Sequence, residues 1–348
     1  MSLLERRYRA WLRLLPASYR AEREEEMVSA LLEGSPDVSD EDNPRPHWSE
    51  VASVAALAVR VRLGGAGAAP RFRSWGETVR LAAFLGLFFQ AALSVAILEM
   101  TLRMYGVIGV PDPVLAQVLG APGSPDRLVG VLGNLSGTLW MLPFAALVLG
   151  RVRAAGWLSL PAFAPDLYNL AAAVWWGEAT AGLVTRVSTS ALILLALWAG
   201  YHRDAPPVRR SPWTLALPLA AGAAIITLHR LVRPSPDTPA WWWPWLGGSG
   251  LASTLILGTG IACLCVYAYA PARRTPSWPL ALAILAVPVF CNRLAVLQFD
   301  VADEAGRVIT TVTLIQAAAL LAVAVALAVV GTRALPATPA PEPRESEA

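Results

Sequence analysis

The stretch VITTVTLIQAAALLAVAVALAVV, residues 308–330, decides the fold of this chain. It carries no charged side chain. As a helix it would be about 35 Å long, which exceeds the ~30 Å hydrocarbon core of a bilayer. The whole chain shares its character, because 55% of the residues are hydrophobic and only 15% are charged, against about 25% charged in an ordinary soluble domain. The sequence therefore predicts a protein for which a lipid bilayer is the main solvent.

Seven further stretches have a similar composition and a length near the ~20 residues that a span requires. The expected spans are residues 80–99, 128–150, 154–176, 183–201, 212–230, 250–270, 277–297 and 308–330. Pro161, Pro165 and Asp166 interrupt the third, so the continuity of that span stays open. The predicted fold class is all-α: a polytopic membrane bundle of about eight spans, residues 71–332.

Arginine placement predicts the orientation of these spans. With a cytoplasmic N-terminus, the short inside loops 151–153, 202–211 and 271–276 hold seven Arg in 19 residues. The outside loops hold four Arg in 63 residues. This contrast follows the positive-inside rule. We expect a multi-pass protein of the cell (plasma) membrane with both termini in the cytoplasm.

A polar head precedes the bundle. Residues 1–70 predict a cytoplasmic domain of three helices, at 3–15, 17–33 and 49–63, with apolar side chains at helical spacing. The glycine-rich stretch 64–70 is expected to be a flexible joint into the membrane. At the other end, the Pro- and Glu-rich tail 333–348 predicts a disordered cytoplasmic segment.

The segment RRYRAWLRLLPASYRAEREEEMVSALLEG, residues 6–34, resembles the head of a group of uncharacterised actinobacterial integral membrane proteins. It also resembles the short HAAS-like or permease-prefix segments that precede membrane modules. The resemblance rests on three short runs, Leu14-Leu15-Pro16, Tyr19-Arg20 and Glu25-Glu26-Met27. It implies a cytoplasmic signalling or partner-docking module attached to a membrane body, and it assigns no catalytic residue.

Charged side chains within the spans are the candidate ligand-binding residues, because a charge in hydrocarbon is costly and marks a site hypothesis. Five of them fall in the outer third of the membrane, and Asp166 falls near mid-depth. The full set is Glu99, Asp166, Arg186, His229, Arg230 and Arg293. Either they line an outward-facing polar cavity, or they pair with one another or with lipid headgroups for structural reasons.

A second candidate site lies in the head, where arginines flank a tryptophan. Its residues are Arg6, Arg7, Arg9, Trp11 and Arg13. Arginines near the surface of an anionic leaflet gain about 1 kcal/mol each. Residues 1–70 are therefore expected to dock either a cytoplasmic protein partner or the inner leaflet.

Several chemistries are excluded or unsupported. All basic residues are Arg, so a Walker-A phosphate loop and a Schiff-base lysine are absent. Cys263 and Cys265 are two residues apart on a helix and face different sides, so no metal site is expected. No cofactor, catalytic residue or nucleic-acid partner is predicted. The expected function is a non-enzymatic signalling, regulatory or scaffold role; the alternative is a small-molecule transporter or permease component.

The topology generates a direct test. Reporter fusions at residues 205 and 275 should both report a cytoplasmic position, because both follow an even number of expected crossings beside arginine clusters. Alkaline phosphatase and green fluorescent protein activities at each fusion point measure this. Opposite locations for the two reporters would contradict the eight-span topology.

Overall fold

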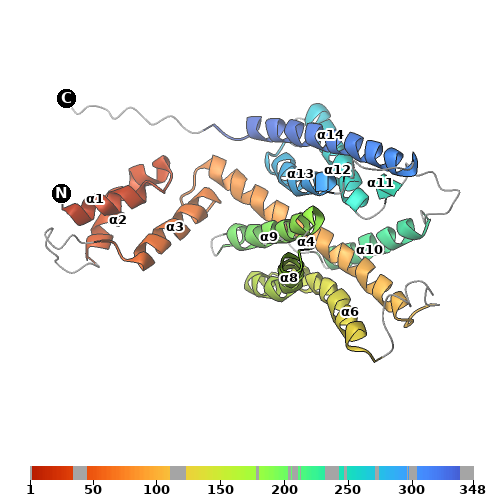
Figure 1. Cartoon of the computed structure of the whole chain (residues 1–348). Coiled ribbons are helices and arrows are strands. Elements are labelled where there is room, and N and C mark those ends of the chain that lie inside the picture. The colour runs from red at the N-terminus through yellow and green to blue at the C-terminus, as the bar shows by residue number, and fades with distance from the viewer. Residues whose placement is uncertain are drawn as a thin grey trace.

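The computed structural model describes residues 2–33, 45–109, 123–177, 180–202, 205, 211, 213–231, 243–246, 249–270, 274–295, 297 and 304–337. These residues form helices joined by turns, and no strand occurs among them. The all-α prediction is confirmed to this extent. Figure 1 shows a small helical head at one end of the chain and a larger bundle of helices beside it.

The head contains α1 (Leu3–Leu12), α2 (Ala17–Glu33) and α3 (Trp48–Arg62). The helix α4 (Pro70–Met104) follows and enters the bundle. One side of the bundle holds α6 (Pro125–Ser136), the 3₁₀ turn η2 (Gly137–Trp140), α7 (Met141–Val148), α8 (Val152–Trp175) and α9 (Ala181–Gly200). The other side holds α11 (Trp243–Leu246), α12 (Ser249–Tyr269), α13 (Ser277–Ala295) and α14 (Glu304–Arg333), and α10 (Trp213–Leu231) packs against α4 and α7.

Among the residues that the structure describes, five helices are long and apolar enough to cross a bilayer: α4, α9, α12, α13 and α14. They support a multi-pass membrane protein. The expected span 128–150 is not one α-helix, because η2 divides it. Pro143 lies one turn beyond η2 and has no N–H for the carbonyl of Leu139, which removes an α-helical hydrogen bond there. By contrast, α8 runs through Pro161 and Pro165 as one helix.

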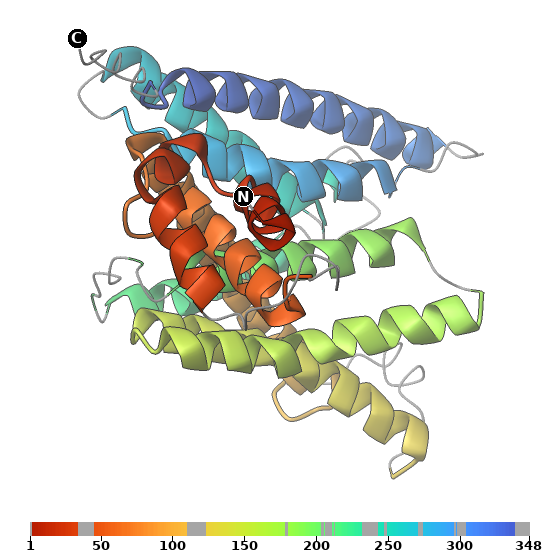
Figure 2. The ribbon, with the colours of Figure 1, turned by 90° about the vertical axis from the view of Figure 1, so that its left-hand side faces the viewer.

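The helix α4 occupies the centre of the bundle. It packs against α9, α10, α13 and η2, and Figure 2 shows it between the two groups of helices. Small residues make this possible, since Gly86 lies so close to α9 that an added methyl group would come 2.6 Å from Ile193 Cγ1. Around this contact, Leu87, Leu147 and Leu197 are almost fully buried.

The head has its own hydrophobic core, shared by all three of its helices and completed by the start of α4. Its buried members are Leu12, Leu15, Tyr19, Val28, Val54, Ala58, Val61 and Ala68, with Phe72 packed against them. The hydroxyl of Tyr8 also joins α1 to α3 by donating to Glu50 Oε2 at 2.8 Å. The first helix ends at Leu12 rather than residue 15, where i→i+3 bonds such as Leu15 N to Leu12 O replace the helical pattern before Pro16.

The expected flexible joint at 64–70 is a compact turn instead. Gly64 and Gly67 have positive φ angles of 84° and 77°, which allow the chain to reverse. Ala68 is buried in the head core, and the amide of Gly65 donates to Arg60 O at 2.8 Å. Helix α4 then begins at Pro70, ten residues before the expected span, so it extends about 15 Å beyond that expected span toward the head.

A close contact between α12 and α14 gives a matched pair of variants. A methyl group on Gly260 would come 2.6 Å from Val323 Cγ1, whereas one on Gly258 would meet nothing within 4 Å. Gly260→Val should therefore destabilise the protein by about 1–3 kcal/mol through overpacking, and Gly258→Val should cost less. Thermal unfolding in detergent measures the difference. Equal melting temperatures for the two variants would show that this helix contact is not tight.

Candidate functional site

Polar side chains of the described bundle form several clusters, and three of them contain charged residues predicted from the sequence. One joins Asp166 to Arg186, a second joins Glu99 to Arg230, and a third surrounds Arg293. Four of the charged residues predicted from the sequence thus form two ion pairs, Asp166 with Arg186 and Glu99 with Arg230, while Arg293 donates to the neutral groups of Ser253, Pro244 and Gln316. Each cluster can be assigned to the helix contact that contains it.

The Asp166 cluster links α8, α9 and α4. The carboxylate is buried, with a side chain 5% exposed. It accepts hydrogen bonds from Arg186 Nη2 at 2.7 Å and from Ser190 Oγ at 2.9 Å. Gln90 Nε2 of α4 in turn donates to Ser190 Oγ at 3.2 Å. An ion pair supported by a second donor can offset the cost of a charge in a low-dielectric interior, so this cluster holds three helices together.

The Glu99 cluster lies near the end of α4 that is farther from the head. Glu99 Oε1 accepts from Arg103 on the same helix and from Arg230 on α10. The arginine side chains are 40% and 49% exposed, so this pairing is partly solvated. His229 precedes Arg230 on α10, but its side chain lies outside the described residues.

The Arg293 cluster is the most buried, since Arg293 is 3% exposed and Ser253 and Gln316 are fully buried. Arg293 Nε donates to Ser253 Oγ at 2.9 Å, and Nη2 donates to Pro244 O and to Gln316 Oε1. These partners come from α12, α11 and α14. Gly250 must be a glycine here, because a methyl group would overlap Pro244 O and come 2.9 Å from Arg293 Nη2.

Sequence reasoning missed the neutral partners in these clusters, namely Gln90, Ser190, Ser253 and Gln316. A search restricted to charged residues passes over them. A signal was present, because an amide inside an uncharged span needs a hydrogen-bonding partner in hydrocarbon. Gln316 stands in the uncharged span 308–330, and Gln90 stands in the uncharged stretch 81–98 of the first span.

Metal or redox chemistry finds no support in the part of the chain that the structure describes. No group of three or more His, Cys, Asp or Glu side chains lies close enough to hold an ion there. The three cysteines are free thiols, and Cys265 and Cys291 are exposed on the surface of the bundle. The polar clusters can fix neighbouring helices in place.

In the head, the candidate arginines have different surroundings. Arg9 is engaged within the fold, because its guanidinium donates to both Glu25 oxygens at 2.8 and 2.9 Å and to Glu5 Oε1. This bonding holds the pKa of Glu25 below its ordinary 4.5. The resulting support for the α1–α2 contact is present above that ordinary value and is lost as the pH falls through the lowered pKa. Arg6 and Arg13 are exposed, and Arg7 is half-buried.

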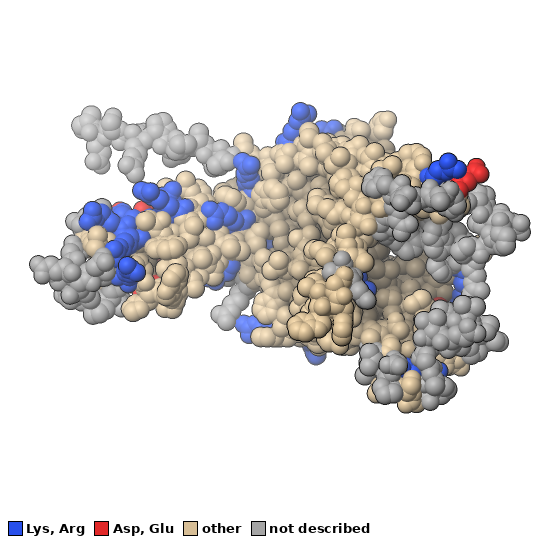
Figure 3. Space-filling view, in the orientation of Figure 1, with Lys and Arg blue, Asp and Glu red and all other residues tan. Residues whose placement is uncertain are grey.

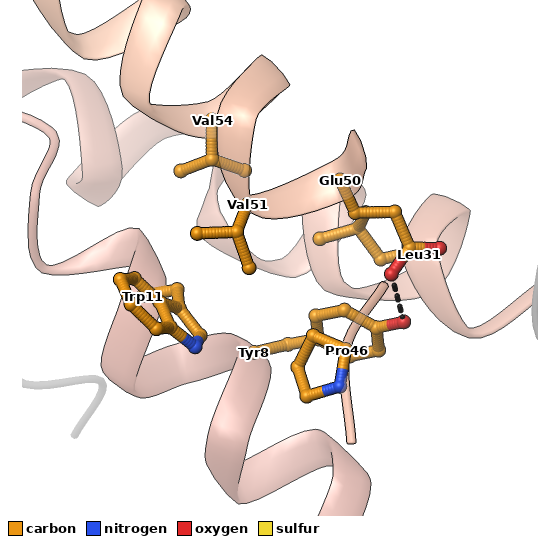
Figure 4. A pocket seen from close by; sticks show the side chains of 7 residues that line it. All are labelled: Tyr8, Trp11, Leu31, Pro46, Glu50, Val51 and Val54. Atoms are coloured by element: carbon orange, nitrogen blue, oxygen red, sulfur yellow. Dashed lines mark hydrogen bonds between the residues drawn. The ribbon is translucent and has the colours of Figure 1, made fainter. Parts of the chain in front are cut away.

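Trp11 lies at a shallow apolar depression between α1, the end of α2 and α3. Tyr8, Trp11, Leu31, Pro46, Glu50, Val51 and Val54 line it, as Figure 4 shows. Other apolar side chains of the head are also exposed, with Leu14 at 39% and Trp48 at 84%. The head therefore presents aromatic and aliphatic surface beside the exposed Arg6 and Arg13.

No protein-family model matches the chain, and no curated protein and no solved structure matches it either.

The Asp166 cluster makes a specific prediction about stability. Arg186→Ala should destabilise the protein by about 1–3 kcal/mol, because the buried carboxylate loses its charged donor. The double variant Asp166→Asn/Arg186→Ala should recover part of this loss, since no unpaired carboxylate remains. Arg153→Ala, at an exposed position of α8, is the control. Thermal unfolding in detergent compares the four proteins, and a melting temperature for Arg186→Ala equal to that of Arg153→Ala would contradict the assignment.

Proposed function

We propose that this chain is a non-enzymatic membrane protein whose cytoplasmic head docks a protein partner and whose spans anchor and orient that head. The main observation in support of this proposal is that Ala68 and Phe72 pack into the core of the head. Because Phe72 belongs to α4, the docking module and the central membrane helix share one folded unit. The partner would then regulate, or be regulated by, the membrane body.

The exposed side chains of the head support a docking role. Trp11, Leu14 and Trp48 expose 38%, 39% and 84% of their surface outside the expected spans. Aromatic residues are enriched at the centres of protein interfaces, commonly together with arginine. The resemblance of residues 6–34 to prefix segments agrees with this proposal.

A protein partner suits the head better than the inner leaflet does. The N-terminus lies at the end of the head opposite to the bundle, as Figure 1 shows. Trp11 and Arg13 belong to the N-terminal helix and its C-cap, and Arg9 of the same helix is engaged by Glu25. An anionic leaflet attracts free basic side chains near its surface, and the guanidinium of Arg9 is already engaged by Glu5 and Glu25 within the head.

The eight-span topology is part of the same proposal. The end of α14 at Arg333 lies at the same end of the bundle as the head (Figure 1). Five spans would place the two ends of the bundle on opposite sides of the membrane. The proposal therefore includes further crossings, formed by the stretch from α6 through η2 to α7, by α8 and by α10. The basic residues coloured in Figure 3 also gather on the head and the adjoining end of the bundle.

The arrangement of the polar clusters supports anchoring over transport. A transporter usually gathers its substrate-binding groups near the bilayer midplane, at one interface between repeats. Here Asp166, Glu99 and Arg293 each have hydrogen-bond partners on the helices packed around them. The pairing stabilises helix contacts, which is the role that the proposal gives to the bundle.

Site-specific photo-crosslinking in living cells tests the docking function. A benzophenone side chain placed at Trp11 or Trp48 of the full chain should yield a protein adduct of one defined mass. The same group at Ser29, an exposed position on α2, serves as the control. Arg13→Glu should lower the adduct yield several-fold, because reversing a charge at an interface rim slows association.

Two outcomes would count against this proposal. Adducts to lipid alone at positions 11 and 48 would move the docking surface to the membrane. Yields no higher than at position 29 would remove the docking role of this surface.

A further inference from the structure

The junction between the head and the bundle is unusually tight. A methyl group on Gly76 of α4 would overlap the carbonyl oxygen of Leu63, which ends the third head helix, and would come 3.3 Å from Arg80 Nη1. The last turn of the head thus rests directly on the backbone of α4, one turn before Arg80. Only glycine permits this contact, because any side chain there would push the head away.

A second helix of the bundle reaches the same place. A methyl group on Gly200, at the end of α9, would come 3.2 Å from the backbone nitrogen of Arg80. The hydroxyl of Tyr201 donates to Arg80 O at 3.2 Å. His202 Nε2 then lies 3.3 Å from Leu63 O, the same carbonyl that sits on Gly76. The end of α9 therefore contacts both α4 and the head.

The opposite half of α9 is tied to the Asp166 cluster. Arg186 and Ser190 bond to Asp166, and Gln90 of α4 bonds to Ser190. Residues 181–200 form one uninterrupted helix, and His202 follows it within two residues. A shift of the paired half along or around the helix axis would move the contact at His202 as well.

We propose that α9 couples the Asp166 cluster to the orientation of the head, and we call this coupling the link. The contact between His202 Nε2 and Leu63 O, which we call the latch, holds the head against α9. The close approach of Leu63 O to Gly76 holds the head against α4. The inference rests on the proposed docking function for its biological purpose, but its physical content is independent of any partner. Loss of the hydrogen bonds to Asp166 would let α9 shift and would weaken the contact between His202 and Leu63. Loss of the latch would free the head while leaving the Asp166 cluster intact.

Two buried polar atoms at the junction favour a contact between His202 and Leu63 that can open. His202 Nδ1 and Arg80 Nη1 are buried and have no hydrogen-bond partner among the described residues. A buried polar atom without a partner raises the free energy of the arrangement that holds it. Opening of the junction would expose both atoms to water, and their hydration would partly offset the free energy of breaking the bond between His202 and Leu63.

Pulsed electron–electron double resonance, which measures distances between two spin labels, tests this coupling on the full chain in lipid nanodiscs. Spin labels at Ser53→Cys in the head and Arg153→Cys in the bundle, both exposed, report the orientation of the head after the three native cysteines are replaced by serine. The wild-type background should give one narrow distance distribution. Gly76→Ala and His202→Ala should broaden it or add a second peak, and Gly258→Ala, where a methyl group meets nothing within 4 Å, should leave it unchanged.

Transmission along α9 is tested by Asp166→Asn in the same labelled protein, which should broaden the distribution in the way that His202→Ala does. A narrow distribution in Asp166→Asn would overturn the link, and a narrow distribution in both Gly76→Ala and His202→Ala would overturn the latch. Hydrogen exchange at residues 60–68 checks that a broadened distribution reflects an open junction, since those amides should lose protection while α13 keeps its own. The crosslinking result at Trp11 and Trp48 is independent, so a failed docking function and a failed link can be told apart.

Discussion

Hydrocarbon offers no hydrogen bonds, and this constraint governs the whole bundle. Every backbone amide in the membrane must be satisfied within its own helix, and every buried polar side chain needs a partner, either on its own helix, as for Thr101 and Ile97 O, or on a neighbouring one. The Asp166, Glu99 and Arg293 clusters are solutions to the second requirement. Their positions differ because each lies where particular helices already meet, such as α8 with α9 or α12 with α13. Polar pairing thus follows the helix contacts and reinforces them.

Close approach of the backbones is the other condition for these contacts. Without a hydrophobic driving force between helices in lipid, van der Waals packing at small residues has to supply much of the association. Gly86 against Ile193, Gly222 against Val95 and Gly260 against Val323 are three such places, on three different helix pairs. The same device recurs at the junction of head and bundle, where Gly76 receives a carbonyl oxygen instead of a side chain.

The sequence was sufficient to predict the all-α fold class and those helices that are marked by the spacing of their own apolar residues. The head helices 17–33 and 49–63 differ from α2 and α3 by at most one residue at each end, because their apolar spacing and their polar flanks mark them. Five of the expected spans are long, uninterrupted and apolar in the structure as well. The break at Gly137–Trp140 was not foreseen, since it depends on how Pro143 is accommodated in a helix that looks uniformly apolar. The partners of Asp166 and Arg293 could not be foreseen either, because they depend on which helices pack together.

The continuity of α4 has a consequence for how the head is aimed. Residues 70–80 are helix rather than linker. The rotation of the head about the axis of α4 is therefore fixed by the rotation of the membrane part of that helix. Adding a single residue in this segment would turn the head by about 100° and lift it by about 1.5 Å, whereas adding four would nearly restore its original facing. The direction in which the proposed docking surface faces around the membrane normal therefore depends on the number of residues between the head and Leu81.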